Sequence, residues 1–540
     1  MATASTLPAA QIRPAAHATT RTTLLIIAVL MITTVVARAL PGPRTIDDAF
    51  ITFRYSRNLV EGQGFVYNPG VATLGTTTPL FAGVLAGIAA VTGGQDFQLY
   101  AIAVSALADA ATVVLLFLLA RRLIGVDWLA ALPGLLWAIS PMSVTFAVGG
   151  METSVTIFWM TLTMWLFVTA STSDRWRWKE YAVGVAVALG LLTRVDSALL
   201  YAPLFFYQLG ERWLTTRGQP LIARLPWRTW AGGAVVMLPW LMFSVLYFGS
   251  PIPNSVTAKR FAYLIEPGSA LAQMIQTYSN PFFEFDTFGP IGPMIGSVLY
   301  LTLSAFALLF VARRLPRLLP FVIYPWVYFA AFAILNPLIF RWYMAPPLPA
   351  LMLGIVVGAW ALLRPLAERE GAAQRIAQGI VGALGAVWIF TSVNGWTLTP
   401  DHGPERPTPR MAWHALELLY ERMGTTLRED YGVTAETRVA SGDIGAVGYF
   451  SRATIVDTVG LVTPELTAYY PVDPALIAEG QNYAIPPQLI YDEQPAYLVT
   501  MEGFVRLGLA TEDRFTEAYA LELDWPFPFY GASMQLWVRE

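Results

Sequence analysis

Two adjacent carboxylates, Asp47 and Asp48, are the residues of this sequence whose type and placement most clearly indicate chemistry. They lie in the stretch RTIDDAFITFR (44–54), directly after the first long apolar segment, 22–40. One carboxylate can act as a general base that deprotonates an acceptor hydroxyl, and its neighbour raises its pKa or shares a divalent cation with it. We expect one of the two, by preference Asp47, to be a catalytic base. The alternative is structural, with one acid capping the following helix and the second near the positive end of its dipole.

Further ionisable residues stand near the ends of apolar segments, where charge is rare in this chain. They are Glu152, Arg194, Asp196, Lys259, Arg260 and Arg341. Ionisable groups at membrane depth are costly and are usually functional or mutually paired. The structural alternatives are an ion pair between Arg194 and Asp196, ordinary loop charge at Lys259 and Arg260, and an interfacial anchor at Arg341.

The acids and the cations together indicate a site for a phosphate-linked substrate at the depth of lipid headgroups. Its carboxylates are Asp47, Asp48 and Glu152, and its cations are Lys259, Arg260 and Arg341. Cations hold a phosphate leaving group, while acids activate an acceptor. Glu152 is predicted to support the base or to share a metal ion with Asp48, and a divalent cation, Mg or Mn, is the only cofactor that these residues suggest.

Composition identifies the elements that must position these residues. The chain is 55% hydrophobic and 13% charged, with a mean hydropathy of +0.52. Soluble domains carry roughly a quarter charged residues, so we expect a polytopic α-helical membrane protein. The absence of cysteine excludes disulfides, thiolate catalysis and Cys-ligated metals, and three histidines are too few for a His-cluster metal site.

A break in charge divides the chain near Trp396. Residues 397–540 hold 9 arginines and 21 acidic residues, whereas residues 1–396 hold 25 basic and 16 acidic residues. We therefore predict a disordered cytoplasmic tail (1–21), a transmembrane domain (22–396) and a separate C-terminal domain (397–540).

The transmembrane domain is predicted to contain about 11 spans, each of roughly 20 apolar residues. The candidates are 22–40, 98–120, 127–146, 152–171, 180–194, 197–211, 229–248, 294–312, 318–335, 343–363 and 376–396. With the N-terminus in the cytoplasm, 17 basic residues fall on the cytoplasmic side and 8 remain for the spans and outer loops. This distribution requires the apolar piece 78–93 to be a juxtamembrane or re-entrant helix on the outer face.

The same orientation places the elaborated loops outside the membrane. They are a first outer loop (41–97), a large outer loop (249–293) and the acidic C-terminal domain. In that domain, residues 439–450 predict a strand, a glycine turn and a short helix, and alternation at 496–500 and 534–538 predicts strands. The spacing GxxGxxG is not a dinucleotide fingerprint, so we expect a small extracytoplasmic α/β domain without one.

Several motifs resemble one family. The stretch DDAFITFRYSRNLVEGQGFVYNPG (47–70) resembles the first outer loop of GT-C glycosyltransferases that use polyprenyl-phosphate sugars, and it is most similar to cell-wall terminal arabinofuranosyltransferases and their relatives. Further matches are GMET (150–153), LTRVD (192–196), PIPNS (251–255) with AKR (258–260), FRWY (340–343), GDIG (442–445) and DTVGL (457–461). One departure is LGTTTP (74–79), where relatives often carry an aromatic or charged residue, so the donor sugar stays open.

The resemblance implies a GT-C fold, an aspartate base in the first outer loop and a lipid-phosphate donor. On the matching motifs, the expected substrate-binding residues are Arg54, Arg194, Asp196, Asn254, Lys259, Arg260, Arg341 and Tyr343. The expected protein lies in the bacterial inner membrane and transfers a sugar, arabinofuranose or another pentose or hexose, from polyprenyl phosphate to a cell-envelope glycan or protein outside. Sugar transfer with inversion needs such a base. No nucleic-acid partner is expected.

Two rival functions belong to other classes. A transporter or flippase for lipid-linked sugar predicts internal repeats, which the sequence lacks. A non-catalytic subunit of envelope assembly predicts that the outer carboxylates are individually dispensable.

Overall fold

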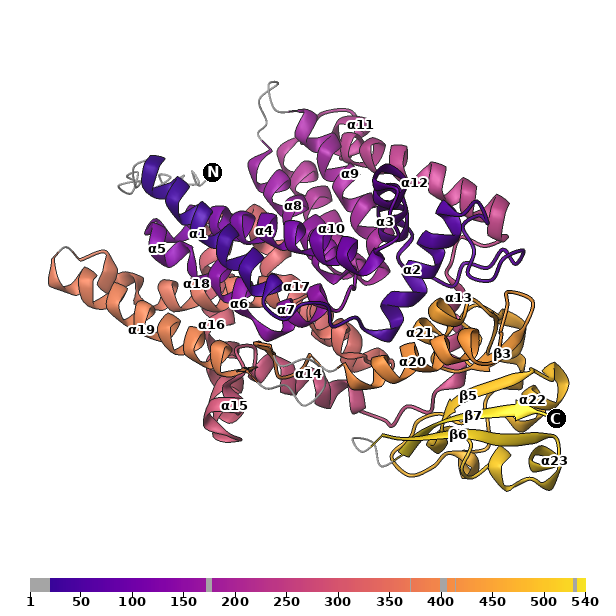
Figure 1. The fold of residues 1–540 in the computed structure, drawn as a ribbon. Helices are drawn as coiled ribbons and strands as arrows, with labels where there is room; N and C mark the ends of the chain where they lie inside the picture. The colour runs from indigo at the N-terminus through magenta and orange to yellow at the C-terminus, as the bar shows by residue number, and fades with distance from the viewer. Residues whose placement is uncertain (1–19, 171–176, 370, 399–405, 413, 528–531) are drawn as a thin grey trace.

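The computed structural model describes residues 20–170, 177–369, 371–398, 406–412, 414–527 and 532–540. Within these ranges the chain forms a large helical body followed by a smaller domain built on a five-stranded sheet (Figure 1). Of the predicted tail (1–21), residues 1–19 lie outside the described residues, and the first helix, α1, begins at Thr20.

Seven helical segments among the described residues are long and apolar enough to cross a membrane. They are α1 (Thr20–Ala39), α4 (Phe97–Ile124), α12 (Trp227–Phe248), α16 (Ile291–Arg314), Pro316–Leu335 with α17 (Leu319–Leu335), Arg341–Ala367 with α18 (Leu348–Ala367), and α19 (Ala372–Asn394). Three more predicted spans fall outside these criteria: α8 (Thr153–Thr169), α9 (Trp178–Thr193) and α10 (Ala198–Thr215). The predicted positions are helical, but the predicted count of 11 crossings is not confirmed.

The predicted span 127–146 is broken. It consists of α5 (Asp127–Ala130), α6 (Leu132–Ile139) and α7 (Pro141–Val148), and the axis bends by 45° before α7. Pro141 has no backbone N–H and excludes the helical conformation from Ser140, whose ψ of 128° is extended. Counted as one span, this segment raises the number of candidate crossings in the described residues to eight.

Both loops that were predicted to lie outside the membrane fold into short helices. The first contains α2 (Asp47–Val60) and α3 (Pro79–Thr92), and the second contains α13 (Asn254–Ala262), α14 (Ser269–Ser279) and α15 (Glu284–Phe288). With 14 residues, α3 is about 21 Å long, short of the roughly 30 Å of a bilayer core. This length agrees with the predicted juxtamembrane or re-entrant helix.

The C-terminal region is an α/β domain, as predicted. A short antiparallel pair, β1 (Trp396–Thr397) and β2 (Thr408–Pro409), leads through α20 (Ala415–Glu429) to a sheet of order β4-β3-β5-β7-β6. Its strands are β3 (Arg438–Ser441), β4 (Thr454–Asp457), β5 (Tyr497–Met501), β6 (Tyr519–Phe527) and β7 (Ala532–Arg539). Its helices are α21 (Gly445–Ser451), α22 (Pro487–Glu493) and α23 (Asp513–Thr516).

The sheet is mixed, and α21 is its link to the helical body. β3 pairs in parallel with β4 and β5, so α21 serves as the crossover from β3 to β4. The predicted strands at 496–500 and 534–538 and the strand, turn and helix at 439–450 are confirmed by β5, β7, β3 and α21. α21 packs on α2, so the sheet domain lies directly beside the stretch that carries Asp47 and Asp48 (Figure 1).

Candidate active site

The stretch before α2 is held by the end of the broken helix. The backbone amides of Arg44 and Ile46 donate to the carbonyls of Val148 and Gly149, each at 3.0 Å. The bend at Pro141 directs the end of α7 toward Arg44 and Ile46. The same bend therefore positions the start of α2.

Asp47 is bound to the C-terminal domain. Its Oδ1 accepts from the amide of Ala446 at 2.7 Å, and its Oδ2 accepts from the amide of Gly445 at 3.0 Å. A Cβ at Gly445 would lie 1.9 Å from the Asp47 carbonyl oxygen, so only glycine allows this approach. Burial, and then the charge of Asp443, raises the pKa of Asp47, while the two amides oppose the rise.

Asp47 thus meets the N-terminus of α21 and does not cap its own helix. The residue before α2 is Ile46, and no side chain caps α2. The structural alternative predicted that one of the two acids would cap the helix that follows it, α2. Asp47 does accept from helix amides, but they belong to α21. With both carboxylate oxygens occupied by protein donors, Asp47 is the less suitable base.

Asp48 is the member of the pair that faces a cation. Its side chain is 30% exposed, and its Oδ2 lies 3.6 Å from the ammonium of Lys259 on α13. That ammonium also lies 4.4 Å from the centre of the Phe340 ring. Burial lowers the pKa of Lys259, but the charge of Asp48, the Tyr343 side chain and the hydrogen bond to Asp48 together raise the pKa overall. The geometry therefore favours Asp48 over Asp47 as a base.

A third aspartate, Asp443, completes this acidic group from the C-terminal domain. The hydroxyl of Tyr420 donates to its Oδ2. Burial raises the pKa of Asp443; the hydrogen bond from Tyr420 opposes the rise, and the charge of Asp48 adds to it. Burial raises the pKa of Glu417 to about 7; the charge of Arg341 opposes this rise and the charge of Asp443 adds to it.

None of these C-terminal residues was predicted as part of a site. Asp443 stands in the GDIG motif (442–445), which was the one sequence signal available for it. Glu417 and Tyr420 lie on α20 without any motif, and only the packing of α20 and α21 beside α2 brings them here.

The second group of predicted residues forms one ion network around Arg194. Its guanidinium donates to Glu152 Oε1 at 2.8 Å and to both carboxylate oxygens of Asp196, at 3.0 and 2.8 Å. The guanidinium carbon also lies 4.7 Å from the centre of the Tyr343 ring. The alternative of an ion pair between Arg194 and Asp196 is confirmed, with Glu152 as an additional partner. Because Arg194 and Tyr343 both influence the pKa of Lys259, this network adjoins the Asp48–Lys259 pair.

The residues predicted to share a metal ion do not fit one. Asp48 faces Lys259 and Glu152 faces Arg194, so each carboxylate already has a cationic partner. Among the residues that the structure describes, no group of three or more Asp, Glu or His side chains is placed to hold a metal ion. The side chains of Asp48 and Glu152 are therefore placed for contacts with cationic side chains.

Two predicted substrate-binding residues instead hold the C-terminal domain in place. Arg54 is 1% exposed and donates to the carbonyls of Tyr67, Gly448 and Ala453, the second at 2.7 Å. Asn254 donates to the carbonyls of Gly460 and Leu461. These contacts give both residues a structural role.

The remaining predicted cations lie at the rim. Arg260 and Arg341 are exposed, and Arg341 donates to the carbonyl of Met411 at 3.1 Å. Arg260 directly follows Lys259 on α13, and Arg341 directly follows Phe340, whose ring lies against the Lys259 ammonium.

Two family models and several known proteins are similar to parts or all of this chain. Residues 76–243 match a family model described as "Dolichyl-phosphate-mannose-protein mannosyltransferase", and residues 410–537 match "Domain of unknown function (DUF8728)". ArnT from Cupriavidus metallidurans bound to undecaprenyl phosphate superimposes with a TM-score of 0.55 at 16% identity, covering 96% of this chain and 98% of that one. The chain has the GT-C glycosyltransferase fold.

Other relatives extend the comparison. A second similar structure is the archaeal oligosaccharyltransferase AglB from Archaeoglobus fulgidus, in complex with an inhibitory peptide and a dolichol-phosphate. It superimposes with a TM-score of 0.55 at 12% identity, and the match covers 95% of this chain and 74% of that one. A terminal β-(1→2)-arabinofuranosyltransferase of Corynebacterium glutamicum is 28% identical over 239 residues. That match spans 39% of this chain and about a third (32%) of the curated relative. The GT-C resemblance predicted from the motifs is confirmed.

Proposed function

We propose that this GT-C protein is a glycosyltransferase that moves a sugar from a polyprenyl-phosphate donor to a hydroxyl of a cell-envelope glycan or protein. The observation that carries the proposal is the Asp48–Lys259 pair, an accessible carboxylate 3.6 Å from an ammonium group. The similar proteins support it, because they include mannosyl- and arabinofuranosyltransferases and a structure with undecaprenyl phosphate.

In the proposed reaction, Asp48 accepts the proton of the acceptor hydroxyl as the acceptor oxygen attacks the anomeric carbon of the donor. The bond between that carbon and the phosphate oxygen breaks, and its electron pair leaves with polyprenyl phosphate. Lys259, with Arg260 and Arg341 at the rim, stabilises the negative charge that develops on the phosphate. Attack opposite the leaving group inverts the anomeric configuration.

The proposal includes the side of the membrane on which transfer occurs. Arg121 and Arg122 end α4, and Arg313 and Arg314 end α16, as expected of helix ends that face the cytoplasm. The acidic C-terminal domain and Asp48 then lie outside. A multi-pass protein of the bacterial inner membrane with its N-terminus inside has this arrangement.

The test is donor-dependent transfer by the purified protein in liposomes, with a panel of short-chain polyprenyl phosphates carrying pentoses or hexoses. General-base catalysis contributes about 10²–10⁴-fold, so Asp48→Asn should lower kcat by that range. The matched control is Asp96→Asn, an outer-loop acid that accepts only from the Leu99 amide and should keep full turnover.

Full turnover of a folded Asp48→Asn protein would contradict the mechanism. Sugar movement across the liposome membrane without a glycosidic product would favour the transporter. Mass spectrometry of envelope glycans from a deletion strain would identify the sugar and its acceptor.

A further inference from the structure

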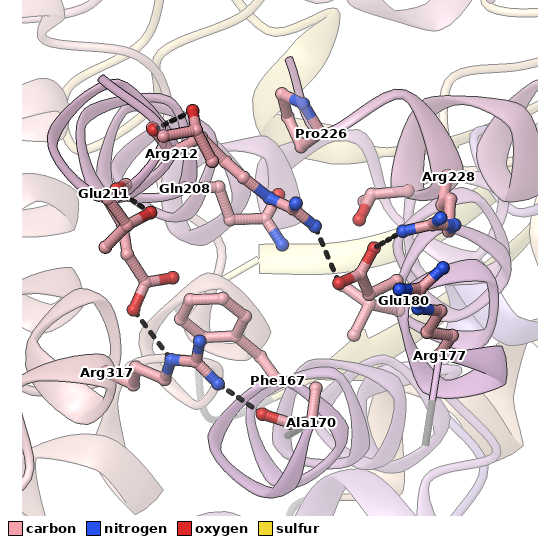
Figure 2. Close-up of a pocket in the computed structure, with 14 residues that line it drawn as sticks. Phe167, Ala170, Arg177, Glu180, Gln208, Glu211, Arg212, Pro226, Arg228 and Arg317 are labelled. Atoms are coloured by element: carbon pink, nitrogen blue, oxygen red, sulfur yellow. Dashed lines mark hydrogen bonds and ion pairs between the residues drawn. The ribbon is translucent and has the colours of Figure 1, made fainter. Parts of the chain in front are cut away.

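A cavity of about 240 Å³ has its lining residues drawn in Figure 2. It lies at the ends of α8, α9 and α10 that are opposite to the Arg194 network. α9 runs from Trp178 beside this cavity to Thr193 next to Arg194, and its 16 residues separate the two places by about 24 Å. The cavity is therefore distinct from the proposed active site, and the proposed mechanism uses none of its residues.

Arginine dominates the polar lining of this cavity. Its charged residues are Arg177, Glu180, Glu211, Arg212, Arg228 and Arg317. Figure 2 shows Arg212 and Arg228 reaching the two oxygens of Glu180, at 2.6 and 3.3 Å, while Arg317 reaches Glu211 at 2.7 Å. Four guanidinium groups and two carboxylates leave a charge of +2, which an anionic ligand would complement.

An apolar groove continues from the charged cavity. A second cavity of about 140 Å³ lies between α9, α10 and α12 and shares Gln208 and Thr229 with the first. Its other lining residues are Gly184, Val187, Tyr201, Leu204, Phe205, Trp230 and Gly233. A cationic cavity that opens into an apolar groove suits a ligand with a charged head and a hydrocarbon chain.

The surroundings have the composition of a membrane–water interface. Trp213 and Trp227 are 44% and 41% exposed beside the cavity, and Leu221 and Ile222 on α11 (Leu221–Arg224) are 63% and 69% exposed. Exposed tryptophans with neighbouring aliphatic and arginine side chains are typical of protein that rests at lipid headgroup level.

We propose that the two cavities bind one anionic phospholipid, with its phosphate among Arg177, Arg212 and Arg228 and an acyl chain in the groove along Val187 and Phe205. Guanidinium groups bind phosphate oxygens through paired hydrogen bonds. A free phosphate shares this chemistry with a lipid headgroup, but the continuous apolar groove and the interfacial surroundings favour the lipid.

The test is native mass spectrometry of the full protein released from detergent with phosphatidylglycerol or phosphatidylcholine. The wild type should retain phosphatidylglycerol preferentially. The variant Arg212→Gln/Arg228→Gln should lose about tenfold in affinity for each arginine, because a hydrogen bond to a charged group contributes at least about that factor. The matched control is Arg224→Gln, an arginine of the same region that does not line the cavity.

A second variant keeps the test independent of the ion pairs. Val187→Trp fills the groove and leaves every arginine in place. It should therefore weaken the binding of phosphatidylglycerol without affecting the binding of inorganic phosphate. Equal lipid retention by the double variant and the wild type, or equal losses in Arg224→Gln and the double variant, would overturn the proposal. Competition by millimolar inorganic phosphate combined with no effect of Val187→Trp would assign the site to a soluble phosphate instead.

Discussion

The replacement Asp47→Asn tests whether the two adjacent aspartates divide structure from chemistry. Asp47 accepts from the Gly445 and Ala446 amides through its two oxygens. Asparagine keeps one acceptor oxygen but turns an N–H group toward the other amide, so one of the two bonds is lost. A hydrogen bond to a charged group contributes about 1.5–3 kcal/mol. Relief from burying a charge offsets part of this, which leaves a local cost of about 1–2 kcal/mol.

That cost should appear where the bond is made. Amide hydrogen exchange in α21 (Gly445–Ser451) should accelerate by about 5–30-fold, the factor that corresponds to this free energy. A matched control is Asp473→Asn, which removes another aspartate that accepts from a backbone amide, that of Ala475, in the same domain. The control should leave exchange in α21 unchanged.

Turnover decides between the two aspartates. Asp47→Asn should keep kcat within about tenfold of the wild type, whereas Asp48→Asn should lose about 10²–10⁴-fold with α21 exchanging normally. If Asp47→Asn abolished transfer while α21 exchanged as in the wild type, Asp47 would be the base and the division of roles would be wrong.

Two further predictions follow from Lys259 and Glu417. Lys259→Ala removes the ammonium proposed to bind donor phosphate, so the KM for donor should rise by about 10–100-fold. Lys259→Arg should restore part of the affinity, and an unchanged KM would exclude the role. Glu417 binds a proton more tightly in the folded protein, its pKa being raised from 4.5 to about 7, so stability should fall as pH rises through that window. The free energy of unfolding should fall by about 3 kcal/mol between pH 4.5 and 8, as followed by thermal unfolding. Glu417→Gln should remove most of this pH dependence. The same pH dependence in the variant and the wild type would contradict the raised pKa of Glu417.

Much of the fold was readable from the sequence because membrane helices and strands leave local patterns. The apolar segments became helices, the acidic C-terminal region became an α/β domain, and 78–93 became a short helix, α3. The break at Pro141 was missed because the span was predicted from apolar composition alone, although Ser140-Pro141 is a helix-breaking signal in the sequence. The number of crossings depends on the tilt and depth of α8, α9 and α10, which composition does not determine.

The site was only partly predictable, because its residues come together through long-range packing. Arg194 and Asp196 are two positions apart, so their ion pair could be foreseen. The partner of Asp47 is nearly 400 positions away, and the preference for Asp47 as base could not anticipate that α21 would occupy both of its oxygens. Arg54 matched a family motif, but the motif does not show whether its guanidinium faces substrate or backbone carbonyls.

The contacts of Arg54 and Asp47 also bear on the order in which the protein is made. Arg54 donates to a carbonyl 394 positions later in the chain, and Asp47 accepts from an amide 398 positions later. The loop that contains α2 is therefore synthesised long before its partners in the C-terminal domain exist. Until α21 has been synthesised and has docked, Arg54 and Asp47 lack these hydrogen-bond partners. The stretch that holds Arg54 and Asp47 therefore reaches its final packing only after a domain made much later in the chain has folded against it.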